Sequence, residues 1–317
     1  MFGIVIPILF VILVGFVYGR WKNPSPEAEA HINRYVMYIA LPCMMFLAVA
    51  NASVEELSRG AFLGAGLAGI AAAYGLGLFI ARRSGIGMPQ NAIVGMTASF
   101  GNTGYMGIPV LVAAFGEAAA APAAIATIIH NIPAFFAVIM TFGACSAREG
   151  EKGGALAASL FRAMRAVLSN PLTVSAFAGG FFAVCDVPLP VQLETFTRLM
   201  AAAAAPTGLF VLGISLARMD VRRHISRSKL RLVLPVVAVK NVIQPAVTLL
   251  AALLLGMEWG ELWLITAVVI AATPTGATTY LFAFLYKTDT AIPSVAIIIS
   301  SVLSILTLPL ALWALQG

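Results

Sequence analysis

Long stretches without charge constrain this chain more than any other feature. Ten stretches of at least 19 residues contain no Asp, Glu, Lys or Arg, apart from one that Lys240 interrupts. They are 1–19, 35–54, 60–81, 84–116, 118–147, 166–185, 199–217, 232–257, 262–286 and 290–317. A helix needs about 20 apolar residues to cross a bilayer. Backbone groups cannot stay unpaired in lipid, and alternating ten-residue strands are absent, so we predict an all-α membrane protein with ten transmembrane helices.

The composition excludes most soluble functions. Apolar residues make up 61% of the chain and charged residues only 10%, which is too few charges to cover a soluble domain of this size. The three cysteines form no CxxC pair, so neither a zinc site nor a disulfide framework is expected. The sequence has no GxxxxGK[ST], HExxH or GxSxG motif, so we expect no ATP-driven motor, no catalytic residues and no cofactor.

The distribution of basic residues predicts the orientation. The loops between helices 1 and 2, 3 and 4, 5 and 6, 7 and 8, and 9 and 10 all lie on one side of the membrane. These five loops contain 16 of the 19 Lys and Arg residues. Only Arg59 and Arg198 fall on the other side, and Lys240 lies within a span. By the positive-inside rule, both termini are extracytoplasmic, in the inner membrane of a cell. The first stretch lacks a basic region and a cleavage site, so we interpret it as a retained helix rather than a signal peptide. The net charge of +6 therefore reflects orientation and does not indicate nucleic-acid binding.

Ten helices divide into two sets of five across the longest hydrophilic break in the chain. We predict a first repeat at 1–147, a cytoplasmic linker at 148–165 and a second repeat at 166–317. An odd number of helices per repeat inverts the second repeat relative to the first. Matching helices support this repeat, because Pro42 ends an IALP segment in the second helix and Pro206 ends an AAAP segment in the seventh.

Two helices carry clusters of helix-breaking residues at their centres. The fourth contains GNTGYMGIP (101–109) and the ninth contains TPTGATTY (273–280). Gly and Pro weaken a helix interior, and the freed backbone groups need partners in lipid. We predict that both helices unwind at the membrane centre, where their half-helix amino ends favour an anion. The alternative is two proline kinks that Ser and Thr satisfy. The hydrogen-bonding candidates are Asn102, Thr103, Thr275, Thr278 and Thr279.

Five further polar residues lie within predicted spans, three in the eighth helix and two in the fifth. Lys240 is the only charge inside a span, and an intramembrane cation is a functional candidate. It either pairs with an anionic substrate or bonds freed carbonyls in place of a sodium ion; alternatively, its long stem reaches the interface. Asn241 and Gln244 share its helix. His130 and Asn131 are candidates for a proton or polar relay, although a histidine bonded to a neighbouring helix backbone is the simpler interpretation.

Three segments resemble the auxin efflux carrier family, which includes plant auxin exporters and bacterial carriers of malonate and other organic acids. They are INRYVMYIALP (32–42), NTGYMGIPVL (102–111) and ATPTGATTYLFAF (272–284). Lys240 and Pro245 also resemble that family's basic residue five positions before a proline. The resemblance covers nearly the whole chain. Because the long hydrophilic loop of the plant exporters is missing, the chain resembles a prokaryotic member, which argues against auxin itself as the substrate.

The resemblance implies a fold similar to the bile-acid/sodium symporters. Helices 1, 2, 6 and 7 would form a scaffold, and helices 3–5 and 8–10 a transport domain in which the broken helices 4 and 9 cross. The crossing would involve Asn102 to Pro109 and Pro274 to Gly276. The family also implies elevator-like movement and a homodimer.

Together these observations predict a secondary transporter that moves a small organic anion, such as a malonate-like mono- or dicarboxylate, by alternating access. The alternatives are a sodium-coupled symporter of the bile-acid type, a membrane enzyme or sensor, and a channel. No metal is expected, because almost no carboxylate lies within a span. The predicted substrate-site residues are Asn102, Thr103, Gly104, Pro109, Lys240, Pro274, Thr275, Gly276, Thr278 and Thr279, with His130, Asn131 and Asn241 as relay candidates.

Overall fold

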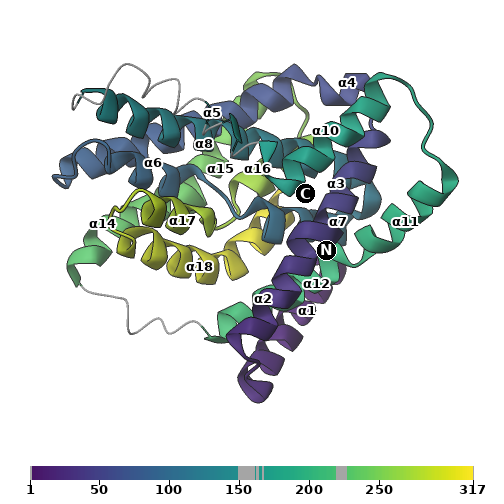
Figure 1. Ribbon diagram of the computed structural model, residues 1–317, viewed down its shortest axis with the longest axis horizontal. Helices are drawn as coiled ribbons and strands as arrows, with labels where there is room; N and C mark the ends of the chain where they lie inside the picture. Colours follow the sequence, from purple (N-terminus) through teal and green to yellow (C-terminus); the bar gives the residue numbers. More distant parts are fainter. Residues whose placement is uncertain (1, 149–160, 162–163, 166–167, 219–226, 317) are drawn as a thin grey trace.

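The computed structural model describes residues 2–148, 161, 164–165, 168–218 and 227–316. The regular elements among these residues are helices, apart from a single isolated β-bridge, as the charge-free stretches predict (Figure 1). Most of the predicted linker at 148–165 lies outside the described residues.

The first part of the chain runs from α1 to α8. Its elements are α1 (Phe2–Lys22), α2 (Pro26–Tyr35), η1 (Val36–Ala40), α3 (Leu41–Ala50), α4 (Val54–Leu57), α5 (Gly60–Arg83), α6 (Asn91–Ser99), η2 (Thr103–Gly107), α7 (Ile108–Phe115), η3 (Gly116–Ala119) and α8 (Ala120–Arg148). The second part has α10 (Pro171–Val184), α11 (Val191–Ala202), α12 (Ala204–Arg218), α14 (Arg227–Ala238), η4 (Val239–Ile243), α15 (Gln244–Leu254), α16 (Leu262–Ala271), α17 (Thr278–Leu285) and α18 (Ala291–Gln316).

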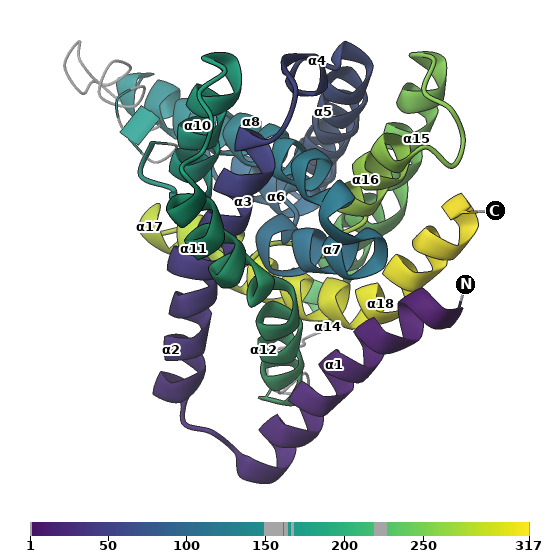
Figure 2. The same cartoon turned by 90° about the vertical axis from the view of Figure 1, so that its right-hand side faces the viewer.

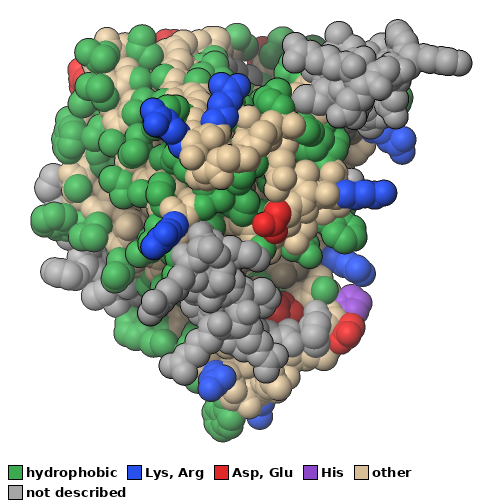
Figure 3. Space-filling model, turned by 90° about the vertical axis from the view of Figure 1, so that its left-hand side faces the viewer, with side chains coloured by type: hydrophobic (Ala, Val, Ile, Leu, Met, Phe, Trp, Pro, Cys, Tyr) green, Lys and Arg blue, Asp and Glu red, His purple; other side chains and the backbone are tan. Residues whose placement is uncertain are grey.

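Six helical segments of the described chain are long and apolar enough to cross a membrane. They are Glu27–Ala50, Val54–Arg83, Thr103–Phe142, Val191–Ser215, Leu230–Leu254 and Ala291–Gln316. Two shorter apolar helices, α10 and α16, lie among them. Large apolar side chains cover much of the outside, and Lys and Arg are scattered between them on the face in Figure 3. That surface suits contact with lipid rather than water.

Several helices begin where the sequence places a capping residue. Ser25 accepts a hydrogen bond from the backbone of Ala28 and precedes Pro26, which suits the first turn of a helix. Asn170 and Pro171 start α10 in the same way. These caps satisfy backbone donors that a helix start leaves without partners.

Small residues let α1 and α12 approach one another closely. A Cβ on Gly15 of α1 would lie 2.0 Å from the Phe210 carbonyl oxygen, and one on Gly213 of α12 would lie 2.1 Å from that of Ile12. The two helices therefore pack backbone to backbone (Figure 2). Such contacts stabilise helix pairs in membranes, where the hydrophobic effect does not drive association between helices.

The helices form two groups that meet around α7. In Figure 1, α5, α6, α8 and α14 to α18 lie towards one end of the molecule, whereas α1 to α3 and α10 to α12 lie towards the other. Within the first group, α5 packs against α6 and α15; within the second, α3 packs against α10 and α11. The broken helices α6–α7 and α16–α17 meet inside the molecule, where the candidate site lies.

Candidate functional site

Two unwound segments cross at the centre of the molecule. The helix α6 ends at Ser99 and α16 ends at Ala271, and Gly101 pairs with Thr275 as an antiparallel bridge between them. The Asn102 N–H donates to the Pro274 carbonyl oxygen at 2.7 Å, and the Gly276 N–H donates to that of Phe100 at 3.0 Å. The two breaks therefore satisfy part of each other's freed backbone, as a membrane interior requires.

Glycine is required at this crossing because the two backbones nearly touch. A Cβ on Gly276 would lie 2.6 Å from the Phe100 ring and 3.0 Å from the Gly101 carbonyl oxygen. A Cβ on Gly101 would lie 2.3 Å from the Thr273 hydroxyl. The glycines in both sequence motifs therefore serve close approach.

A third helix holds the carbonyl ends of both broken helices. The turn η4 is π-helical and lies between α14 and α15, so Lys240 and Gln244 emerge one turn apart. Lys240 Nζ donates to the Ala271 carbonyl oxygen at 2.6 Å, and Gln244 Nε2 donates to that of Ser99 at 3.0 Å. Each side chain thus supplies a donor at the last residue of one interrupted helix, where carbonyls lack helical partners.

The burial of Lys240 bears on one of the alternatives for this residue. Its relative exposure is 0%, so the ammonium group is enclosed by protein and does not reach the interface through its long stem. The contact with Ala271 corresponds to the interpretation in which the cation bonds a freed carbonyl. One hydrogen bond leaves two of its three N–H donors for other partners.

Thr275 forms hydrogen bonds to two different helices, α6 and α18. Its hydroxyl donates to the Thr97 carbonyl oxygen at 3.0 Å, and its N–H donates to Ser300 Oγ of α18, also at 3.0 Å. Asn241 Nδ2 lies 3.4 Å from the Ser300 carbonyl oxygen. Because both donors of Thr275 are used within the protein, this residue braces the crossing in the state described.

The other predicted substrate-site residues lie at different distances from the crossing. Asn102 is partly exposed and directly follows the bridge, while Thr103 and Gly104 are buried in η2. Thr278 is partly buried at the start of α17, and the Thr279 hydroxyl donates to the Gly276 carbonyl oxygen at 2.9 Å. Pro109 lies within α7, with its ring close to Gly208 of α12. Pro109 is therefore in the continuing helix, beyond the crossing.

Two of the three relay candidates, His130 and Asn131, are buried in α8, and the third, Asn241, is buried in η4. His130 Nδ1 lies 2.9 Å from the Ala126 carbonyl oxygen of the same helix. A carbonyl only accepts, so Nδ1 carries the proton and Nε2 is the free acceptor in the neutral ring. Neither His130 Nε2 nor Asn131 Oδ1 has a hydrogen-bond partner among the described residues. The histidine thus bonds the backbone of its own helix and not that of a neighbour.

The buried side chains around the crossing include a basic residue and no acidic one among the described residues. Within the part of the chain that the structure describes, Lys240 is the only buried Lys or Arg, and no Asp or Glu is buried. The same residues contain no cluster of His, Cys, Asp or Glu that could hold a metal ion. Lys240 is therefore the one buried basic side chain near the crossing, and no buried carboxylate lies opposite it among the described residues.

Two residues that hold the crossing together, Gln244 and Ser300, are not predicted to do so by the sequence pattern. The sequence places Gln244 one turn from Lys240 without indicating its partner, and neither helix-breaking motif contains Ser300. A signal for Ser300 existed, because Ser300 and Ser304 lie four residues apart in a charge-free, mostly apolar helix and so share a face. Its role depends on α18 packing against the crossing, which no local pattern reveals.

The chain is similar to known membrane transport proteins. A family model described as "Membrane transport protein" matches residues 1–312. A "Putative malonate transporter" of Rhizobium meliloti (strain 1021) is 29% identical over 319 residues, covering 99% of this chain and 96% of the relative. An "Uncharacterized transporter YfdV" of Escherichia coli (strain K12) is 22% identical over 223 residues, covering 68% of each chain.

Proposed function

The chain belongs to the membrane transport protein family, the auxin efflux carriers that its motifs resemble, and from this membership we infer that it carries a small organic anion across the membrane. Family membership makes it a multi-pass membrane protein and a transporter rather than an enzyme. Beyond that, we propose a secondary transporter for a malonate-like mono- or dicarboxylate that works by alternating access. No step requires a cofactor or ATP.

The observation that carries this proposal is the crossing of the two broken helices beside the buried Lys240. Half-helix amino ends present unpaired N–H groups and the positive end of the helix dipole. The η2 turn begins at Thr103 and α17 begins at Thr278, both directly after the crossing. A cation enclosed nearby adds to this field, and no buried carboxylate among the described residues opposes it.

We propose that the carboxylate of the substrate binds at these helix starts. Asn102 is the partly exposed polar residue at the crossing, and its side-chain amide is the best-placed donor. Thr103 and Thr278 supply hydroxyls, and Gly104, where a Cβ would lie 3.1 Å from Leu172, lets η2 pack closely beside that residue. Lys240 acts from behind the crossing, while Thr275 and Thr279 shape the unwound segments.

The architecture that we propose has ten spans, in which α2–α3, α6–α7, α11–α12, α14–α15 and α16–α17 each form one interrupted helix. The repeats are residues 1–147 and 166–317, in opposite orientation, with both termini extracytoplasmic. The scaffold comprises α1, α2–α3, α10 and α11–α12; the moving unit comprises α5 to α8 and α14 to α18. Elevator-like movement of this unit and a homodimer complete the proposal.

Malonate is the first substrate to test, because a relative over nearly the full length carries the name of a malonate transporter. A sodium-coupled symporter of the bile-acid type is the second candidate, since unwound carbonyls can bind sodium. The Lys240 ammonium group on the Ala271 carbonyl counts against it, because a cation already occupies that kind of position.

The test is uptake of radiolabelled malonate into proteoliposomes, with competing acids and with imposed sodium, proton and potential gradients. Wild type should show saturable, competed uptake, which Asn102→Ala and Lys240→Ala should each abolish at normal expression. Lys287→Ala, an exposed cation at a loop, serves as the control and should transport normally. The absence of acid uptake under every gradient would exclude the proposed substrate class. Uptake that survives in both site variants would instead exclude the proposed site.

A further inference from the structure

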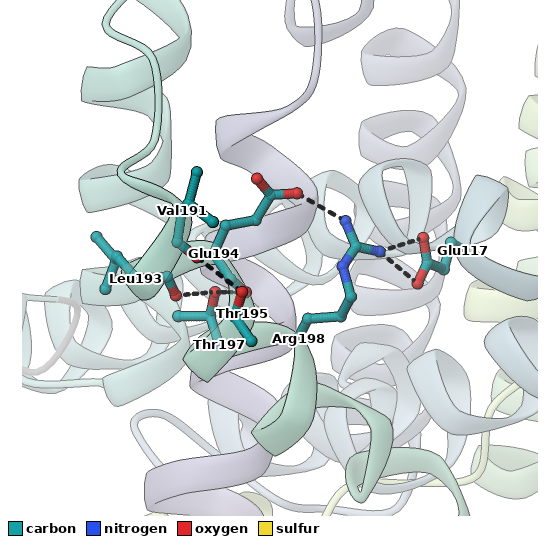
Figure 4. Close-up of polar contacts among 7 residues, drawn as sticks. All are labelled: Glu117, Val191, Leu193, Glu194, Thr195, Thr197 and Arg198. Atoms are coloured by element: carbon teal, nitrogen blue, oxygen red, sulfur yellow. Dashed lines mark hydrogen bonds and ion pairs between the residues drawn. The ribbon is translucent and has the colours of Figure 1, made fainter.

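An ion pair joins the two groups of helices away from the crossing. Arg198 of α11 binds Glu117 of η3 through Nη1, which lies 2.9 Å from each carboxylate oxygen, although the residues are 81 positions apart. Its Nη2 binds Glu194, one turn earlier on the same helix, at 2.8 Å. Figure 4 shows the guanidinium group between the two carboxylates.

The pair lies at a cavity between these groups. The cavity has a volume of about 300 Å³. One wall is formed by α3, α4 and α11 and includes Asn51, Glu56 and Arg198; the other is formed by α7, η3 and α8 and includes Val112 and Glu117. The ion pair thus connects the two walls of one cavity.

A second ion pair provides a contrast. Arg59 binds Glu261 and lies over the Trp263 ring, 4.8 Å from its centre. Arg59 directly precedes α5 and Glu261 directly precedes α16, so this pair connects two helices of the same group. Arg59 and Arg198 are the two basic residues that the orientation places outside the cell, and each pairs with a glutamate.

We propose that Arg198 and Glu117 form an extracytoplasmic latch between the scaffold and the moving unit, which must open in each transport cycle. This inference rests on the proposed function, because that function assigns α11 to the scaffold and η3 to the moving unit. Movement of one unit past the other separates the two side chains beyond hydrogen-bond range, whereas the Arg59–Glu261 pair travels intact.

The exposure of the latch suits a contact that opens repeatedly. The Arg198 and Glu117 side chains are 47% and 78% exposed. An exposed pair shifts an equilibrium by only about two- to fivefold, and salt screens it. The latch therefore biases the resting state without locking it.

The experiment follows a reporter cysteine, Ala201→Cys, at a partly buried position of α11 that lines the cavity. It is placed in a full-length protein whose native cysteines are replaced by serine, reconstituted in liposomes, and labelled with a membrane-impermeant maleimide. Arg198→Gln, Glu117→Gln and their double variant should each raise the labelling rate about two- to fivefold. The double variant should match the single ones, because all three remove the same contact.

Two controls separate the latch from local effects. Glu194→Gln alters the same guanidinium group but leaves the contact between the units, and Arg59→Gln breaks a pair within one unit. Both should label at the parental rate. Raising the salt concentration should accelerate labelling of the parent and not of Arg198→Gln, which tests the latch even if a variant folds poorly.

The outcomes distinguish this inference from the proposed function. The latch is wrong if Glu117→Gln labels like the parent, or if Glu194→Gln has an equal effect. If acid transport is absent while labelling changes as expected, the substrate class fails and the latch stands. If transport is normal while labelling is unchanged, only the latch fails.

Discussion

The Lys240 ammonium group and the Ala271 carbonyl oxygen lie 2.6 Å apart, so a buried cation closes the end of a broken helix. The same helix places Gln244 on the Ser99 carbonyl of the other break. One π-helical turn thus fixes both interrupted helices, and such turns recur at functional sites. The fixed backbone then positions the helix starts that we propose for the anion.

Replacement of Lys240 by Met should abolish malonate uptake and lower the Tm. The variant removes the positive charge and leaves a buried carbonyl without its donor, which costs about 1 to 3 kcal/mol. Thermal unfolding in detergent and uptake in proteoliposomes provide the two measurements. Lys287→Met, at an exposed site, should change neither. Parental uptake by Lys240→Met would show that the charge has no part in transport.

Gln244→Met should be destabilising by a similar mechanism, because it removes the donor to the Ser99 carbonyl and keeps the side-chain volume. We expect a lower Tm, together with a reduced maximal rate of uptake as the first broken helix loses its position. Val242→Met, on an exposed position of the same turn, is the control. An unchanged rate in Gln244→Met would mean that the α6 end needs no support from this helix.

Gly276→Ala should abolish transport, because its Cβ would meet the Phe100 ring at 2.6 Å and force the crossing apart. The matched control is Gly75→Ala in α5, where a Cβ meets no atom within 4 Å. Alanine favours helix by about 1 kcal/mol, so that control should retain transport with an equal or higher Tm. Normal uptake by Gly276→Ala would contradict the close crossing in the working protein.

Ser300→Ala should weaken the brace on Thr275, whose N–H would lose its acceptor. The expected cost is about 1 to 3 kcal/mol in the free energy of unfolding, measured by denaturant or heat. Ser294→Ala provides the comparison, because that hydroxyl only bonds the Thr290 carbonyl of its own helix. Equal stability of the two variants would mean that Ser300 does not stabilise Thr275.

Much of this protein was predictable because membranes make local sequence informative. Charge-free length predicts helices, since an unpaired backbone is costly in lipid. Clustered Gly and Pro at 101–109 and 273–280 predict interruptions, since these residues weaken a helix wherever they occur. Each prediction follows from the properties of a single segment. The predicted interruptions agree with the helix ends at Ser99 and Ala271.

The tertiary structure alone decided which partners meet those interruptions. Lys240 could have reached the interface, a substrate or a carbonyl, and only the packing of α14 and α15 selects Ala271. Ser300 and Gln244 acquire their roles in the same way, from helices brought together across the molecule. The pairing of Arg198 with Glu117 depends on the approach of α11 to η3. Hydrogen bonds between distant segments form only where the fold brings those segments together. The local sequence around a residue does not determine which distant segment that is.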